Sequence, residues 1–469
     1  MVGAMTTTQD PSETRPDPAL RAISLVVVLG TVMTMLDATI VNVAINVLGR
    51  DLGVSLSTVQ WTVTGYTLAL SMTIPITGWA IGRFGAKSTW ITSLALFGAG
   101  SVLCGAAWSA GALIAFRVLQ GVGGGLLMPV AQTLLTRAAG PERMGRTMAV
   151  ISIPSMLAPV LGPLLGGVLV DHLSWRWMFY VNVPVCALAL LLAVRLLPRE
   201  ERRADSRLDA LGLALLSPGL AALVYGLSQT GEASGGSRAL AGLVFGVVLT
   251  AAFCAHSLRR GERALLDVAL FRDRGLAASA AALFCYSVGV FGVLLLVPLY
   301  SQSVPGTGVL DAGLLIAPMG AGAIVTMPLA GRLTDRLGAH LPGIAGIVTV
   351  LAGIFACARV DMSAGASPLA AALFVIGLGH GLVTPSIMAA AYRTLPRSVL
   401  PGAATASQIV IRVGTALGAA VITVILQTLT RGSDGPQAAA FEGSLLWATA
   451  IVAVALVPAL LIPRRQAAP

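Results

Sequence analysis

Asp37 is the residue whose surroundings point most directly to chemistry. It lies in LDATIVNVAIN (36–46), among leucine, isoleucine and valine, and is the only one of 20 acidic residues that we place deep inside an apolar run. A carboxylate there costs about 3 kcal/mol by membrane-insertion scales, and is a functional-site candidate. Because an apolar surround disfavours the charged form, proton uptake and release is the chemistry suggested. The alternative is a carboxylate permanently paired with a cation for packing.

The composition indicates the solvent around this run. Of 469 residues, 56% are hydrophobic and only 11% are charged, whereas a soluble protein carries roughly 25% charged residues. Apolar stretches close to the roughly 20 residues that span a bilayer recur from end to end. They are continuously apolar rather than alternating, which excludes a strand barrel. We therefore expect an all-α integral membrane protein.

Several other classes are excluded. The five cysteines fall inside apolar runs, so they predict neither a disulfide framework nor a metal site. The net charge of +10 comes from short loops, where orientation and anionic lipid explain it without nucleic acid. The sequence has no phosphate-binding G-x-x-x-x-G-K-[ST] loop, HExxH motif or nucleophile elbow, so we expect neither ATP as the energy source nor an enzyme.

Apolar runs between polar breaks predict fourteen spans. They lie near 21–48, 59–80, 88–108, 110–135, 147–170, 177–197, 209–229, 238–257, 276–300, 311–330, 342–360, 368–391, 403–430 and 444–463. Of 30 basic residues, 23 lie on the side that holds both tails and five on the other. The positive-inside rule places both termini in the cytoplasm of a multi-pass cell-membrane protein. Residues 1–20 are polar and proline-bearing, which is typical of a disordered cytoplasmic tail rather than a signal peptide.

An internal repeat relates the two halves. GWAIGRFGAK (78–87) and GRLTDRLGAH (331–340) share a pattern, as do GVGGGLLMP (121–129) and GLGHGLVTP (377–385). The displacements of 253 and 256 residues indicate duplication of a six-span unit, with spans 7 and 8 inserted between the halves. Six spans return the chain to its starting side, so the repeats are parallel. That arrangement is typical of transporters with a midplane site between two bundles.

Five motifs in this order resemble the major facilitator superfamily, and within it the fourteen-span drug:proton antiporters. They are LDATIVNVAIN, GWAIGRFGAK, RVLQGVGGG (117–125), PVLGPLLGG (159–167) and WRWMFYVNVPV (175–185). The resemblance covers nearly the whole chain. It implies a fold of two six-helix bundles plus two central spans, and export by alternating access driven by inward proton flow, without a cofactor.

The sequence departs from the family pattern at several positions. Gly82 stands where members usually carry an aspartate in the first loop motif, whereas the second copy keeps it as Asp335. Either the loop after span 2 does not gate through a carboxylate, or this role has moved to the second half. Asn46 replaces a usual proline and Cys186 a usual glycine, which affects helix geometry more than chemistry.

The partner that we predict for Asp37 is Arg117. Asp37 lies about 24 Å above the cytoplasmic start of span 1, and Arg117 roughly 20 Å up a 30 Å core, at 1.5 Å per residue. Protonating Asp37 would break such a pair and give a switch biased by one proton. The alternative is a fixed structural bond from Arg117 to backbone carbonyls.

Two sets of residues have a mechanical interpretation. Span 5 contains prolines and glycines that let a helix bend and a neighbour approach, as any tight membrane helix pair could use: Pro159, Gly162, Pro163, Gly166 and Gly167. The loops after spans 2 and 10 would gate the cytoplasmic side, the alternative being plain positive-inside anchors. They contain Gly78, Arg83, Gly85, Gly331, Asp335, Arg336 and Gly338.

The substrate cavity is predicted from scattered polar residues in spans. These are Asn42, Trp61, Tyr66, Gln120, His380 and Arg412. A lone histidine such as His380 is more often a hydrogen-bonded packing residue. A single membrane carboxylate balances one positive charge, which favours neutral or monocationic substrates.

These inferences define the organisation and function that we expect. The predicted segments are a tail at 1–20, a first bundle at 21–197, linkers with the inserted spans at 198–275, a second bundle at 276–463 and a tail at 464–469. We expect a monomer that exchanges protons for lipophilic drugs. The alternatives are a narrow exporter of one metabolite or antibiotic, and a proton-independent lipid or solute facilitator or sensor, for which Asp37 should be dispensable.

Overall fold

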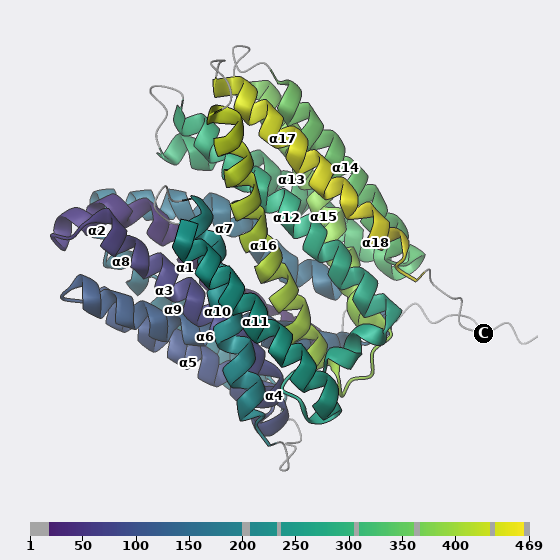
Figure 1. The fold of residues 1–469 in the computed structure, drawn as a ribbon. Coiled ribbons are helices and arrows are strands. Elements are labelled where there is room, and N and C mark those ends of the chain that lie inside the picture. Colours follow the sequence, from purple (N-terminus) through teal and green to yellow (C-terminus); the bar gives the residue numbers. More distant parts are fainter. Residues whose placement is uncertain are drawn as a thin grey trace, which may run out of the picture.

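The computed structural model describes residues 18–198, 207–231, 236–303, 309–360, 366–431 and 437–463, and in these ranges the regular elements are all helices. Figure 1 shows two diverging groups of helices, the first in purple and blue and the second in green and yellow. Residues 1–17 and 464–469 of the predicted tails lie outside the described ranges. Residues 18–20 are helical, so the predicted limit of the tail is wrong there. Proline suits the first turn of a helix, where its missing N–H is not needed.

The first group is built from the N-terminal part of the chain. Its elements are α1 (Pro18–Ile40), η2 (Val41–Ala44), α2 (Ile45–Asp51), α3 (Leu56–Thr73), η3 (Ile74–Ile76), α4 (Thr77–Phe84), α5 (Ala86–Gly105), α6 (Ala110–Ala139), η4 (Pro141–Arg143), α7 (Met144–His172), α8 (Trp177–Tyr180) and α9 (Asn182–Leu196). Its apolar core includes the fully buried side chains of Trp90, Leu94 and Phe97 in α5.

The second group follows the inserted helices. Its elements are α12 (Arg274–Ser303), α13 (Val309–Leu337), α14 (His340–Arg359), α15 (Ala366–Arg393), α16 (Leu400–Arg431), α17 (Gln437–Val454) and α18 (Leu456–Leu460). The two groups meet where α7 packs against α13 and α15, and where α16 packs against α4 and α6.

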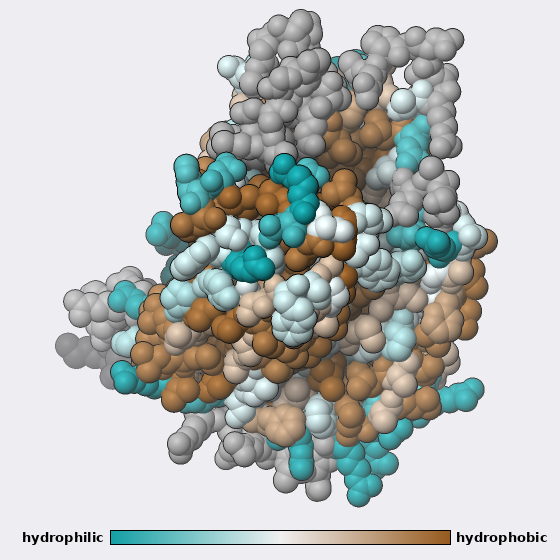
Figure 2. Space-filling model, turned by 90° about the vertical axis from the view of Figure 1, so that its left-hand side faces the viewer, coloured by the Kyte–Doolittle hydropathy of each residue, from teal (hydrophilic) through white to brown (hydrophobic). Residues whose placement is uncertain are grey.

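The inserted segment is a helical hairpin. It comprises α10 (Ala210–Ser228), η5 (Gln229–Gly231) and α11 (Gly236–Arg260), followed by η6 (Gly261–Arg263) and η7 (Val268–Arg272). The inner helix α10 packs against both α3 and α16, so the hairpin lies along the junction of the two groups (Figure 1). The outer helix α11 leaves Leu240, Val244 and Phe245 more than half exposed, as a lipid-facing helix would. Figure 2 likewise shows hydrophobic side chains over much of the face that it presents.

A buried carboxylate holds the base of this hairpin. Asp209 precedes α10 and accepts hydrogen bonds from the backbone N–H groups of Gly212 and Leu265, each at 3.1 Å. His256 Nε2 lies 3.0 Å and an Arg260 nitrogen 3.3 Å from the same carboxylate. The segment that we interpreted as a linker is therefore packed at this point, because one side chain satisfies donors from α10, α11 and the turn after η6.

The glycines of the internal repeat pack in the same way in both halves. A Cβ on Gly121 or Gly125 would meet backbone oxygens of α3 within 2.5 Å, and one on Gly123 would meet backbone atoms of α5. In the second copy, Gly377 and Gly381 face α13 whereas Gly379 faces the backbone of α14. Alternating glycines thus let one central helix approach two neighbours, as small residues do in membrane bundles.

The number of spans is confirmed only in part. Among the described residues, twelve helices are long and apolar enough to cross a membrane, or up to thirteen if the bent helix α7 is one span. The helix Leu56–Thr73 is not among them, and it is interrupted by η3 before continuing as α4. The predicted count of fourteen therefore depends on this broken helix.

Candidate functional site

Asp37 lies at the centre of a buried polar network. Its side chain is fully buried in α1, three residues before the α-helix gives way to η2. Arg117 of α6 forms a salt bridge to its Oδ2 atom. The Oδ1 atom accepts hydrogen bonds from Gln120 of α6 at 2.9 Å and from Asn182 of α9 at 2.8 Å. Both carboxylate oxygens are therefore occupied, and the predicted pairing of Asp37 with Arg117 is present.

Arg117 extends this network to α3. Its Nε atom donates to the backbone carbonyl of Thr62 at 3.1 Å, and the side-chain carbonyl of Gln120 accepts from Nη1 at 2.7 Å. The guanidinium carbon lies 4.0 Å from the centroid of the Tyr66 ring, a favourable cation–π arrangement. Pairing with a carboxylate and bonding to a backbone carbonyl were the two alternatives from the sequence, and Arg117 does both.

A serine closes the network on its far side. Ser101 of α5 accepts hydrogen bonds from Gln120 at 2.6 Å and from Asn182 at 3.2 Å. Five helices of the first group thus contribute to one fully buried cluster. A buried ion pair adds little net stability over an apolar replacement, but removing one partner costs about 3–5 kcal/mol. The arrangement is therefore highly sensitive to a single charge change at Asp37.

The glycines predicted in span 5 place α7 directly beside Asp37. The hydroxyl of Thr39, two residues after Asp37, donates to the backbone carbonyl of Ala158 in α7 at 3.0 Å. A Cβ on Gly162 would collide with the Thr39 hydroxyl, and one on Gly166 would lie 3.1 Å from the backbone oxygen of Ile40. The predicted small-residue contact face is therefore real, and its partner is α1.

The same helix is bent. Its axis changes by 41° between Ala158 and Leu161. Pro159 and Pro163 lie at this bend in the chain, and a proline removes a backbone donor and displaces the carbonyl one turn earlier. A Cβ added to Gly167, by contrast, would meet no atom within 4 Å, so this glycine contributes no helix contact.

The start of α7 contacts the second group of helices. The carboxylate of Asp335, near the end of α13, accepts a hydrogen bond from the backbone N–H of Gly145 at 2.8 Å and lies 3.4 Å from Nε of Arg146. A Cβ on Gly331 would be 2.7 Å from the Cα atom of Arg146. The two helix ends therefore touch backbone to backbone, on the side that carries the arginine-rich loops.

The first copy of the loop motif is arranged similarly but lacks the carboxylate. Gly78 of α4 faces α16, where the backbone of Gly402 lies 3.8 Å from a Cβ position. Gly85 and Gly338, equivalent in the repeat, both adopt positive φ angles of 84° and 87° immediately after α4 and α13. These are conformations that glycine adopts readily. The exposed side chains of Arg83 and Arg336 lie at the same helix ends.

The family assignment follows from comparison with known proteins. The model of the Major Facilitator Superfamily matches residues 27–419, with a further match over residues 280–468. The chain belongs to the Major Facilitator Superfamily. It is therefore a transporter of this superfamily, of the multidrug efflux type, and not an enzyme.

Relatives in this superfamily extend over nearly the whole chain. A multidrug resistance protein B homolog of Mycobacterium tuberculosis is 37% identical, over 97% of this chain and 92% of its own length. The tetracenomycin C resistance and export protein of Streptomyces glaucescens is 30% identical over 88% of this chain and 76% of its own. Among solved structures, the human organic anion transporter MFSD10 superposes with a TM-score of 0.65 and 16% identity, covering 96% of this chain and all of the other. This last likeness shows the Major Facilitator fold.

The predicted cavity residues of the first bundle are distributed differently from our expectation. Gln120 is fully buried in the Asp37 network and does not face open space, and Tyr66 is buried beneath Arg117. Trp61 is 43% exposed and stacks against Tyr225 of the inserted helix α10, with ring centroids 6.1 Å apart. Asn42 is exposed in η2. The sequence identified these residues as polar or aromatic, but the helix rotation decides which way each one points.

The second bundle contributes two polar residues in its spans. His380 shares a hydrogen bond with the Tyr286 hydroxyl at 2.8 Å, and lies 3.3 Å from the hydroxyl of Thr384. It is thus hydrogen-bonded within the second bundle and only partly buried. Arg412 lies within electrostatic range of Tyr66 and, in the described part of the chain, makes no ion pair. It adds positive charge near the junction of the two bundles.

Asn182 and Ser101 were missed by reasoning from sequence. Asn182 lies inside WRWMFYVNVPV, so its polarity within an apolar run was a usable signal. Ser101 gave none, because small hydroxyl residues in membrane helices usually bond to their own backbone. Only the packing of α5 against α6 and α9 brings it to the network.

Proposed function

We propose that this transporter exports lipophilic drugs or other toxic compounds from the cytoplasm by alternating access, in exchange for protons. The observation that carries the proposal is the fully buried Asp37 carboxylate, paired with Arg117 in the middle of a bundle. Relatives named for multidrug resistance and for tetracenomycin C resistance and export support the class of cargo. The proton gradient would be the energy source, and no cofactor is required.

The proposed coupling step is protonation of Asp37. A proton on Oδ2 takes the place of the Arg117 guanidinium and leaves that cation without its counter-charge in a dry interior. The network is then less favourable than one in which α1 and α6 have moved apart. When Asp37 releases the proton to the other side, the pair forms again and the helices return.

Helix α7 is suited to carry this change to the gate. Its second half packs on α1 through Gly162, next to Thr39, and its first turn is held by Asp335 of the other bundle. A shift of α1 therefore acts on the second half of the bent helix α7, and the first turn of α7 joins the two bundles. If the arginine-rich loops lie in the cytoplasm, as the positive-inside rule predicts, the contact between α7 and α13 would close the transporter on the cytoplasmic side.

The charge distribution favours neutral cargo over cations. The sequence predicted that Asp37 balances one positive charge on the substrate. In this state, however, the positive charge beside Asp37 is that of Arg117. A monocation would have to displace Arg117, whereas a neutral lipophilic compound would not. Arg412 adds a second cation near the junction.

The predicted fourteen spans are completed, in this proposal, by the interrupted helix from Leu56 to Phe84.

The decisive experiment is uphill efflux from everted vesicles with an imposed pH gradient, comparing the wild type with Asp37→Asn. We expect gradient-driven transport to be lost in the variant, while downhill equilibration of the same dye persists. Uphill export at the wild-type rate by Asp37→Asn would contradict the proposal and favour a proton-independent facilitator or sensor.

A narrow exporter of one metabolite is the second candidate. The relative named for tetracenomycin C resistance and export favours it. A panel of neutral, monocationic and anionic compounds on the same vesicles separates the two. Export of several unrelated neutral compounds supports a multidrug exporter, and export of a single compound supports the narrow alternative.

A further inference from the structure

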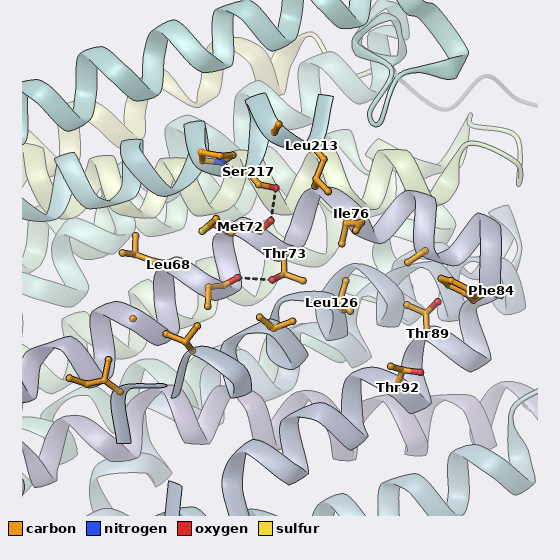
Figure 3. A pocket seen from close by; sticks show the side chains of 18 of the residues that line it. Leu68, Met72, Thr73, Ile76, Phe84, Thr89, Thr92, Leu126, Leu213 and Ser217 are labelled. Carbon is orange, nitrogen blue, oxygen red and sulfur yellow. Dashed lines mark hydrogen bonds between the residues drawn. The ribbon is translucent and has the colours of Figure 1, made fainter. Parts of the chain in front are cut away.

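A large apolar cavity lies away from Asp37 in the described part of the chain. It has a volume of about 1060 Å³ and lies between the inserted helix α10 and the helices α3 to α6. We call it the lateral groove. Its lining includes Trp61, Met72 and Phe84 from α3 and α4, Val118 from α6, and Leu213 from α10. In Figure 3, Leu213 and Ser217 approach from one side, and Leu126, Thr89 and Thr92 lie opposite. Without the inserted helix α10, the groove would be open on that side.

The lateral groove offers an occupant almost no polar partner. None of the described residues that line it is charged. Three of its hydroxyl groups are used by backbone carbonyls: Ser217 donates to Met72 at 2.6 Å, Thr73 to Ala69 at 2.7 Å and Thr89 to Gly85 at 2.9 Å. A polar or charged ligand would lose its hydration there without compensation. The body of the occupant must therefore be apolar.

The shape of the groove suits a chain rather than a compact molecule. Along α3 and η3 it extends from Trp61 to Ile76, which is about 22 Å at 1.5 Å per residue. This exceeds the roughly 15 Å that one leaflet contributes to a 30 Å hydrocarbon core. The groove follows the helices, as lipid tails do. Trp61, stacked on Tyr225, lies at the end remote from Phe84.

The charge at the Phe84 end identifies the class of lipid. Arg83 precedes Phe84 and is exposed, and Arg207 is exposed three residues before α10 begins. Both lie at the arginine-rich ends of helices that form the groove. Basic residues near the membrane surface attract the anionic headgroups of the cytoplasmic leaflet, and each contributes about 1 kcal/mol of binding free energy.

From this geometry we propose that the lateral groove binds an acyl chain of an anionic membrane phospholipid, with its headgroup at Arg83 and Arg207. The groove lies on the faces of α3 and α6 next to those that hold the Asp37 network: its lining residues Trp61 and Gly65 directly precede Thr62 and Tyr66, which contact Arg117. A bound lipid supports the two helices that hold Arg117. The inserted hairpin thus serves to build a lipid site. This inference does not depend on proton coupling.

The test uses the full-length protein in nanodiscs that contain a phosphatidylglycerol with a photoactivatable acyl chain. We expect adducts to concentrate on peptides of α3, α6 and α10. Val118→Trp should lower this labelling at least about fivefold by filling the groove. Val244→Trp, on the exposed face of α11, is the matched control and should leave it unchanged. Should Val118→Trp fail to fold, Ala214→Trp fills the groove from α10.

Headgroup selectivity and competing occupants are tested in the same system. The phosphatidylglycerol probe should label the groove at least about threefold more than a phosphatidylcholine probe with the same chain, and Arg207→Gln should reduce this preference. Labelling spread evenly over lipid-facing helices, or unaffected by Val118→Trp, would overturn the proposal. So would stoichiometric displacement of the lipid probe by an uncharged lipophilic dye such as Nile red, which would identify the groove as a drug site.

Discussion

Asp335 of the second bundle caps the first turn of α7 in the first bundle, with its carboxylate 2.8 Å from the backbone N–H of Gly145. An acceptor at a helix N-terminus satisfies a donor that has no intrahelical partner and faces the positive end of the helix dipole. The equivalent position in the first loop motif is Gly82. It lies one turn after Gly78, and Gly78 faces the first turn of α16. One of two pseudo-symmetric contacts therefore has a carboxylate latch and the other has none.

The missing latch can be restored by Gly82→Asp. The new carboxylate should accept from the first N–H groups of α16 and stabilise the closed arginine-rich end by about 1–2 kcal/mol. We expect closer distances between spin labels on α4 and α16 and roughly tenfold slower efflux. Gly82→Ala, which adds a side chain without an acceptor, is the control. Equal behaviour of the two variants would show that no latch forms.

The contact between α1 and α7 predicts that a substitution at Gly162 matters whereas one at Gly167 does not. Gly162→Ala places a Cβ against the Thr39 hydroxyl, whereas Gly167→Ala meets nothing within 4 Å. Overpacking of this kind costs about 1–3 kcal/mol, so Gly162→Ala should lower the melting temperature in detergent and reduce efflux. Gly167→Ala should match the wild type in both measurements. If both variants are silent, α7 does not depend on this contact.

The ion pair predicts strong non-additivity between Asp37 and Arg117. Either Asp37→Asn or Arg117→Gln alone leaves a buried polar group without its partner and should destabilise by about 3–5 kcal/mol. The double variant removes both charges and should be more stable than either single variant. Thermal unfolding of all four proteins in detergent measures the coupling, and additive losses would mean that the two charges do not interact energetically.

The base of the inserted hairpin predicts a pH dependence of stability. Burial of Asp209 opposes its ionisation, but hydrogen bonds from Gly212, His256 and Leu265 outweigh burial and lower the pKa of this carboxyl. Because the pKa of Asp209 is lower in the folded than in the unfolded protein, ionised Asp209 stabilises the fold. This stabilisation is complete above the ordinary carboxyl pKa of about 4 and is lost as the pH falls below that value. Proteolysis after α11 should therefore increase below about pH 4 in the wild type. The Asp209→Asn variant should be cleaved by the protease already at pH 7. If its proteolysis depends on pH as in the wild type, the Asp209 carboxylate does not hold the hairpin.

Several features were predictable because they depend on local composition. Asp37 within an apolar run, the repeated glycine patterns and Pro159 with Gly162 all carry a signal within a few residues. The pairing with Arg117 was also predictable, because helices of fixed rise across a core of fixed thickness make depth a function of sequence position. Depth does not give rotation, however, so Trp61 was expected in the substrate cavity but lines the lateral groove beside α10.

The sequence alone determined that this chain is a membrane protein of two related halves with one deep carboxylate, since hydropathy, repeat spacing and charge bias are properties of the chain. The tertiary structure decided which groups meet. Ser101 and Asn182 reach Asp37 only because α5 and α9 pack beside α1 and α6, and the lateral groove exists only because α10 rests on α3. Such contacts join residues far apart in the chain, and helix rotation and close packing, which no local pattern records, set them.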